Sequence, residues 1–131
     1  MINYLMDDTY RAGACNIGPA EIARRRRSAI ALTAFALVVA VALIASGIPA
    51  TGRVLLLPFA AGAAVTWLQV IRRFCVAFGA VGIRNFGALG TPESVGDSAA
   101  RAADRRTAIR MIVEGSLYGL VVTTVVMLLP V

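Results

Sequence analysis

The chain has 131 residues, of which 59% are hydrophobic and only 15% are charged. A soluble domain carries roughly 25% charged residues, so this composition leaves too little polar surface for a water-soluble globule. The formal net charge is +6, and all 13 basic residues are arginine. No zinc-finger, RRM or helix-turn-helix pattern accompanies these arginines, which lie beside long apolar runs. We therefore expect lipid headgroups rather than nucleic acid as their anionic neighbours.

The chain contains no histidine and two cysteines. Haem groups, pigments and most catalytic zinc sites in helical membrane proteins rely on imidazole ligands. Two cysteines alone cannot supply a four-ligand metal site. We therefore expect no metal and no cofactor ligated by the chain itself.

The sequence CNIGP at residues 15–19 marks the start of a helix. Gly18 suits the N-cap, and Pro19 suits the first helical position, where its missing N–H costs nothing. Glu21 falls where its carboxylate can reach back to the N-cap amide. We predict an N-terminal cytoplasmic segment over residues 1–18, followed by a helical segment over residues 19–48.

Within that segment, residues 28–48 are free of charge and form the first predicted transmembrane span. These 21 residues, at 1.5 Å each, give about 31 Å, which matches the thickness of a bilayer core.

The second predicted span begins at residue 54 and reaches about residue 71, with Trp67 near its end as an interfacial aromatic residue. Pro58 is expected to bend it. Apolar residues keep a helical spacing beyond this span. We therefore predict one helix over residues 54–89 whose part beyond residue 71 forms an amphipathic cytoplasmic or interfacial extension. A re-entrant segment over residues 71–89 is the alternative.

Residues 90–110 are rich in alanine and arginine and predict a cytoplasmic loop with a short helix. Residues 111–131 form the third predicted span. The fold class that follows is an all-α membrane protein with three transmembrane helices.

On this topology every arginine except Arg53 lies on one side of the membrane. Such a bias places the N-terminus in the cytoplasm and the C-terminus on the opposite side. The arginines expected to meet headgroups and fix the orientation are Arg24, Arg25, Arg26, Arg27, Arg72 and Arg73.

Glu114 is the only carboxylate within a predicted span. Acids in lipid are costly and mark ion or proton pathways by default. We favour a simpler interpretation, an ion pair between helices, because Arg110 lies one turn earlier and Arg72 is expected at a similar depth. Gln69 is a further candidate for hydrogen bonding at this intramembrane polar site.

Cys15 and Cys75 are both expected on the cytoplasmic side, close to arginines. One interpretation is a pair of thiolates, activated by the positive charge, that binds a metal or forms a redox-sensitive disulfide. The interpretation we favour is structural, with Cys75 packed as a small apolar residue and Cys15 in a tight turn. A reducing cytoplasm also disfavours a standing disulfide.

Small residues recur at four-residue spacing in the second and third spans, at Ala60 and Ala64 and at Gly115 and Gly119. Such faces allow close helix packing, here against another helix of this chain or of a partner.

Two motifs flank the spans: C-N-I-G-P-x-E-I-x-x-R-R before the first, and F-C-x-x-F-G-x-x-G-x-x-N-F-G after the second. Their pairing, which extends over most of the chain, resembles a group of small bacterial inner-membrane proteins with a CNIG-type motif near the N-terminus. The resemblance implies a multi-pass protein of the bacterial inner membrane and implies no activity.

Our leading hypothesis is a non-enzymatic accessory or structural subunit of a larger bacterial membrane complex, whether respiratory, photosynthetic or transport-related. Its partners would be membrane lipids and other membrane-protein subunits, and a bound lipid or quinone is compatible with it. The second hypothesis is a small homo-oligomeric transporter or channel that uses Glu114. The third is a thiol redox or metal-handling protein that uses Cys15 and Cys75.

Overall fold

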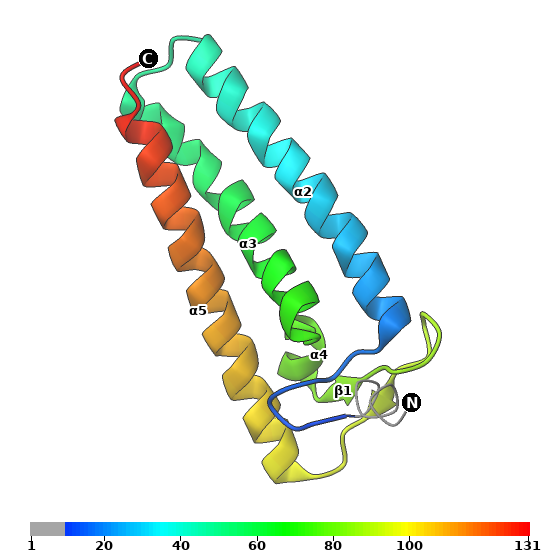
Figure 1. Cartoon of the computed structure of the whole chain (residues 1–131). Helices are drawn as coiled ribbons and strands as arrows, with labels where there is room; N and C mark the ends of the chain where they lie inside the picture. The colour runs from blue at the N-terminus through cyan, green and yellow to red at the C-terminus, as the bar shows by residue number, and fades with distance from the viewer. Residues whose placement is uncertain (1–9) are drawn as a thin grey trace.

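Three long helices lie side by side in the computed structural model, which describes residues 10–131 (Figure 1). They are α2 (Pro19–Ala45), α3 (Leu57–Arg72) and α5 (Ser98–Leu128), and α3 is preceded by a 3-10 helix, η1 (Ala50–Leu56). Together, η1 and α3 form the second of three helical segments that are long and apolar enough to cross a membrane; α2 and α5 are the others. The prediction of a helical protein with three such segments is confirmed.

Helix α2 begins where the sequence predicted, with Gly18 as N-cap and Pro19 in the first turn. The expected return of the Glu21 carboxylate to the N-cap amide is wrong, because the Gly18 N–H donates to the carbonyl of Asn85 at 2.9 Å. Glu21 instead binds Arg25 and Asn85. The helix ends at Ala45, shortly before Gly47, which adopts a positive φ of 70°.

The helix predicted over residues 54–89 is not continuous, and its extension beyond residue 71 is wrong. Pro58 lies in the first turn of α3, where a proline is favoured, rather than at a bend within a helix. Arg73 then adopts a left-handed conformation with φ 54°, and this ends α3. The chain turns into α4 (Val76–Val81), which closes at Gly82 with φ 79°.

Two short strands follow α4 and turn the chain back on itself. Strand β1 (Ile83–Arg84) pairs antiparallel with β2 (Glu93–Ser94). The segment predicted to extend the second helix along the surface therefore contains α4 and β1 and folds back compactly. Its apolar spacing misled the prediction because Phe74, which is fully buried, packs into the same core as residues of α3 and α5.

Helix α5 is a single helix of 31 residues, so the short helix predicted within residues 90–110 continues without a break into the span predicted over residues 111–131. Asp97 caps the helix by accepting a hydrogen bond from the backbone N–H of Ala100 at 2.9 Å. No proline interrupts the run up to Leu128. At 1.5 Å per residue the helix is about 46 Å long, which exceeds the roughly 30 Å of a bilayer core.

Small residues bring α3 and α5 into close contact. A Cβ atom at Gly119 would lie 2.6 Å from the Cα atom of Ala61, and one at Gly115 would lie 2.9 Å from the backbone nitrogen of Val65. The predicted small-residue face of the third span therefore packs against a helix of this chain. Ala60, in the second span, packs in a separate apolar cluster with residues of α2 and η1.

Arg53 lies at the end of the bundle that also holds the C-terminus. Arg53 is 4% exposed, and its guanidinium donates hydrogen bonds to the main-chain oxygens of Val126 at 2.9 Å, Leu129 at 3.1 Å, and Val131. The last carbonyls of a helix lack partners within the helix. Arg53 supplies a partner to Val126 in the last turn of α5 and to two carbonyls beyond it, and so fastens this end of the chain to η1.

We predict that Gly119→Ala lowers the stability of the bundle by about 1–3 kcal/mol, because the added methyl group overlaps the backbone of α3. Gly62→Ala is the matched control, since no atom lies within 4 Å of its added Cβ. Alanine also favours a helix over glycine, so the control should keep or raise the stability. Thermal unfolding in detergent measures both, and equal melting temperatures for the two variants would contradict this packing.

Candidate functional site

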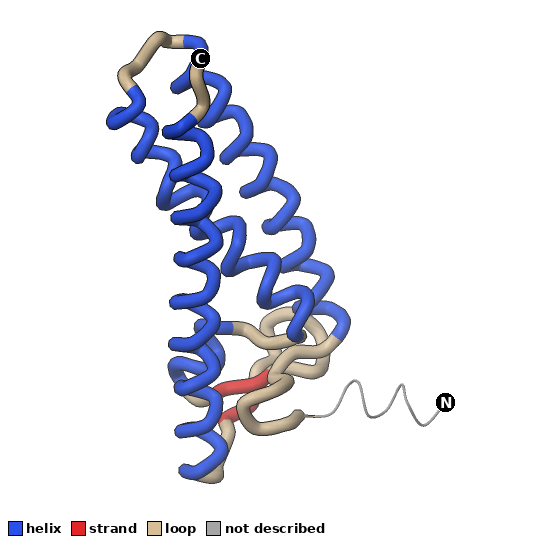
Figure 2. The backbone as a smooth tube through the Cα atoms, turned by 60° about the vertical axis from the view of Figure 1, so that its left-hand side comes forward, coloured by secondary structure: helices blue, strands red, loops and turns tan. Residues whose placement is uncertain are grey.

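The irregular segments gather at one end of the bundle, which we call the cap. It comprises residues 10–18, residues 73–97 and the first turns of α5 (Figure 2). The opposite end holds only the α2–η1 connection and the C-terminus. Every arginine except Arg53 lies at or next to the cap. The cap is the part of the structure richest in polar contacts.

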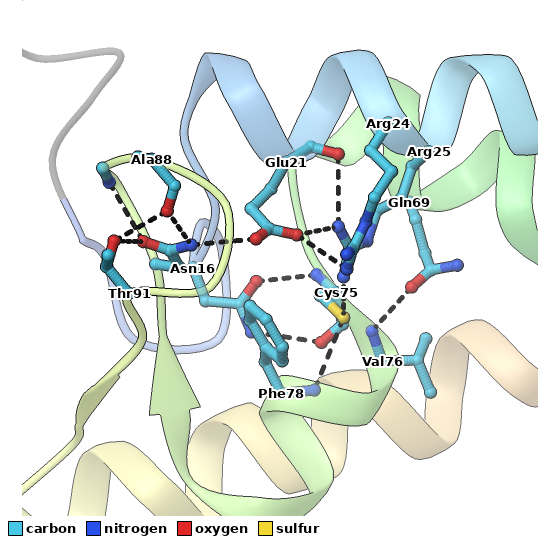
Figure 3. A network of polar contacts seen from close by, with 12 residues as sticks. Asn16, Glu21, Arg24, Arg25, Gln69, Cys75, Val76, Phe78, Ala88 and Thr91 are labelled. Atoms are coloured by element: carbon cyan, nitrogen blue, oxygen red, sulfur yellow. Dashed lines mark hydrogen bonds and ion pairs between the residues drawn. The ribbon is translucent and has the colours of Figure 1, made fainter.

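Asn16 joins the N-terminal loop to the turn between α3 and α4. Its side-chain nitrogen donates to the carbonyl of Cys75 at 3.1 Å, and its side-chain oxygen accepts from the N–H of Cys75 at 2.6 Å (Figure 3). The side chain thus satisfies both backbone groups of one residue, as a neighbouring strand would. Asn16 is fully buried, so water does not compete for these bonds.

Glu21 and Arg25 form a buried ion pair one turn apart on α2. Glu21 also accepts hydrogen bonds from Asn85 at 2.8 Å and from Arg24 at 3.1 Å. Glu21 is 1% exposed and Arg25 is 9% exposed. Burial of both charges is costly unless each is paired and hydrogen-bonded, and these contacts meet that condition.

Arg25 extends the network to the α3–α4 turn. One of its guanidinium nitrogens lies 2.7 Å from the Cys75 sulfur, and the guanidinium carbon lies 5.2 Å from the centre of the Phe78 ring. The same sulfur caps α4 by accepting from the N–H of Phe78 at 3.5 Å. A single arginine therefore contacts a carboxylate, a sulfur and an aromatic face.

Asn85 organises the loop between β1 and β2. Its side chain accepts from the N–H of Gly87 at 3.1 Å and donates to the carbonyl of Ala88 at 2.9 Å. Its backbone carbonyl accepts from the N–H of Gly18 at 2.9 Å. Gly18 is required there, because a Cβ atom would lie 2.9 Å from backbone atoms of Phe86. The residues of both flanking motifs thus meet in one cluster.

Asp104 fastens the N-terminal loop to α5. It is fully buried and accepts from the Tyr10 hydroxyl at 2.7 Å and from the N–H of Gly13 at 2.6 Å. Burial, reinforced by the hydrogen bond to Asp104, raises the pKa of the Tyr10 phenol, so that it remains a donor at neutral pH. Thr107 adds a hydrogen bond to the carbonyl of Gly13 at 2.8 Å.

Sequence reasoning did not single out Asn16, Asn85 or Asp104. For Asp104 a signal was available, since it lies four residues from the buried Ala100 and Ala108 on one face of α5. A carboxylate on an otherwise apolar helix face indicates a buried partner. The two asparagines carry no comparable pattern, because their bonds join segments far apart in the chain.

The four consecutive arginines have different environments. Arg25 belongs to the buried network, and Arg24 forms an ion pair with Glu21 while its side chain stays 49% exposed. Arg26 and Arg27 are exposed. Arg73, predicted to meet headgroups, occupies the left-handed position that ends α3.

Both cysteines are buried and free of disulfide bonds. The Cys15 thiol lies 3.8 Å from the carbonyl of Ile17, and Cys75 belongs to the network described above. Within residues 10–131, no three side chains of the His, Cys, Asp or Glu type are grouped so as to hold a metal ion.

The predicted ion pair between spans is present: Arg72 and Glu114 approach to 2.5 Å. Their side chains are 38% and 30% exposed, and both line a pocket of about 430 Å³ together with Arg110. Gln69, expected near Glu114, instead accepts a hydrogen bond from the N–H of Val76 at 3.0 Å. The structure thus brings Arg72, Arg110 and Glu114 together and assigns Gln69 to the α3–α4 turn.

No protein-family model matches the chain, and no curated protein or solved structure is significantly similar to it. The functional argument therefore rests on the geometry of the cap and of the pocket at Glu114.

We predict that Arg25→Gln lowers the free energy of unfolding by about 3–5 kcal/mol, because it leaves the carboxylate of Glu21 buried and without its ion-pair partner. Arg24→Gln is the matched control. It also removes a positive charge that pairs with Glu21, but this charge lies on an exposed side chain. The free energy of unfolding should therefore fall by less than about 1 kcal/mol. Unfolding in detergent compares the two. Similar losses would show that the buried network does not stabilise the cap.

Proposed function

We propose that this chain is a non-enzymatic accessory subunit of a larger complex in a bacterial inner membrane. The observation that carries the proposal is that the buried polar groups of the cap pair with one another. Asn16 and Glu21 bind Cys75, Arg25 and Asn85. A cap whose buried polar groups are bonded to one another suits a rigid framework that presents its outer surface to partner subunits.

The outer surface at the cap end is basic. Arg26 and Arg27 on α2 and Arg105 and Arg106 on α5 are exposed. These charges suit anionic headgroups and an acidic surface on a partner subunit, which they would attract and orient. Exposed apolar residues along the helices suit lipid or the helices of a partner.

The proposed orientation places the cap in the cytoplasm. The support is the distribution of arginines, of which only Arg53 lies at the opposite end. Positively charged residues in short loops near the ends of transmembrane spans are retained on the cytoplasmic side.

We predict that a periplasmic reporter enzyme fused after Val131 is active and that the same reporter fused within the cap, after Gly96, is inactive. A cytoplasmic reporter at the same two positions should give the opposite pattern. Activity of the periplasmic reporter at Gly96 would contradict the orientation.

We further predict that the tagged chain, expressed at its natural level and extracted in mild detergent, co-purifies with other membrane-protein subunits in a fixed ratio. Mass spectrometry of the eluate identifies them. Arg26→Glu combined with Arg27→Glu should weaken this association severalfold, because both side chains are exposed and the cap stays folded. Recovery of the chain alone or as a homo-oligomer would contradict the proposal.

Thr124→Ala provides a control on the same chain, since this exposed residue of α5 binds only the carbonyl of Leu120 and lies far from the cap. It should co-purify with the partners in the same ratio as the unmodified chain. An equal loss with this control would mean that the association does not depend on the basic surface.

A small homo-oligomeric transporter remains the second candidate. The half-exposed pair of Arg72 and Glu114 beside a pocket favours it. It requires ion- or proton-dependent transport in reconstituted vesicles that Glu114→Gln abolishes, whereas an accessory subunit shows no such transport.

A further inference from the structure

The pocket beside Glu114 is a feature that the proposed subunit role does not use. It has a volume of about 430 Å³ and opens between the N-terminal loop, the end of α3 and the middle of α5. Gly13, Thr107 and the fully buried Phe74 are among its lining residues. Arg72, Arg110 and Glu114 supply its charges.

The charges of the pocket favour an anion. Two guanidinium groups face one carboxylate, and that carboxylate is engaged with Arg72. The Arg110 side chain is exposed and lines the pocket. Its charge attracts the Glu114 carboxylate, but within residues 10–131 the direct ion pair of that carboxylate is with Arg72. Arg110 therefore supplies a guanidinium at the mouth of the pocket, and phosphate oxygens are the acceptors that such a group binds best.

The position of the pocket along the bundle distinguishes a lipid from a soluble anion. On one side lie polar contacts of the cap, among them those of Gly13 with Asp104 and Thr107. On the other side, the neighbouring surface of α3 and α5 is apolar and exposed, with Ile71, Val113 and Leu117 each more than half exposed. A molecule held here would have its anionic group in the pocket and an apolar part along the helices, which describes a phospholipid.

We propose that this pocket binds the phosphate group of an anionic phospholipid, with Arg110 as the principal contact and Arg72 as the second. Glu114 lowers the affinity of the pocket for phosphate, because its carboxylate neutralises part of the charge of Arg72. The pocket is thus a defined headgroup site within the basic end of the molecule. The inference does not depend on membership of a larger complex.

The test measures binding of short-chain phosphatidylglycerol to the purified chain in detergent, by titration and by native mass spectrometry. Arg110→Gln should weaken this binding about fivefold, the effect of one arginine near an anionic headgroup. Arg105→Gln is the matched control. It removes an equal charge five residues earlier, about 140° away around α5, and it does not line the pocket. Binding should be unchanged in the control.

Glu114→Gln gives a second, opposite test, because it releases Arg72 from its ion pair. Phosphatidylglycerol should then bind more tightly, and phosphatidylcholine, which carries no net charge, should bind weakly throughout. Equal weakening by Arg110→Gln and Arg105→Gln would overturn the site in favour of diffuse attraction. Binding of inorganic phosphate as tight as that of the lipid would overturn the lipid assignment, leaving a site for soluble anions.

Discussion

The structure depends on one constraint: a charged pair is buried in a chain that has few charges. Glu21 and Arg25 lie on the first turns of α2, and their remaining hydrogen-bonding groups reach the α3–α4 turn and the β1–β2 loop. Because an unpaired charge in this position would be very costly, all of these segments must be in place together. The segments of the cap therefore fold cooperatively, and their contacts fix the position of α2 relative to the cap.

The spans follow a different principle. Between α3 and α5, the glycines of α5 let the two backbones approach closely at Ala61 and Val65, and the ion pair of Arg72 with Glu114 joins the helices near the cap. In lipid, apolar burial contributes little to helix association, so close packing carries the interface. Polar side-chain contacts between the helices are few: the pair of Arg72 with Glu114 near the cap, the hydrogen bond from the Trp67 indole N–H to the Thr33 hydroxyl between α2 and α3, and the bonds of Arg53 near the C-terminus. Close packing of small residues thus accounts for most of the helix contact, and a few polar contacts add to it.

Local signals were enough to predict the helix start at Gly18 and Pro19, the apolar spans and the pairing of Arg72 with Glu114. They failed where tertiary contacts decide the backbone. Nothing local predicts the left-handed turn at Arg73, since glycine is the usual residue there and helical spacing continues past it. The roles of Asn16 and Asn85 were also beyond reach, because each binds partners supplied by distant segments.

Arg53 has a consequence for the order in which the chain assembles. Its partners are the carbonyl of Val126 in the last turn of α5 and those of Leu129 and Val131 just beyond it, which are synthesised more than 70 residues later. Until they are synthesised, these hydrogen bonds cannot form, and water takes the place of the carbonyls. The link between η1 and the end of the chain is therefore completed last, when the third helix packs against the first two.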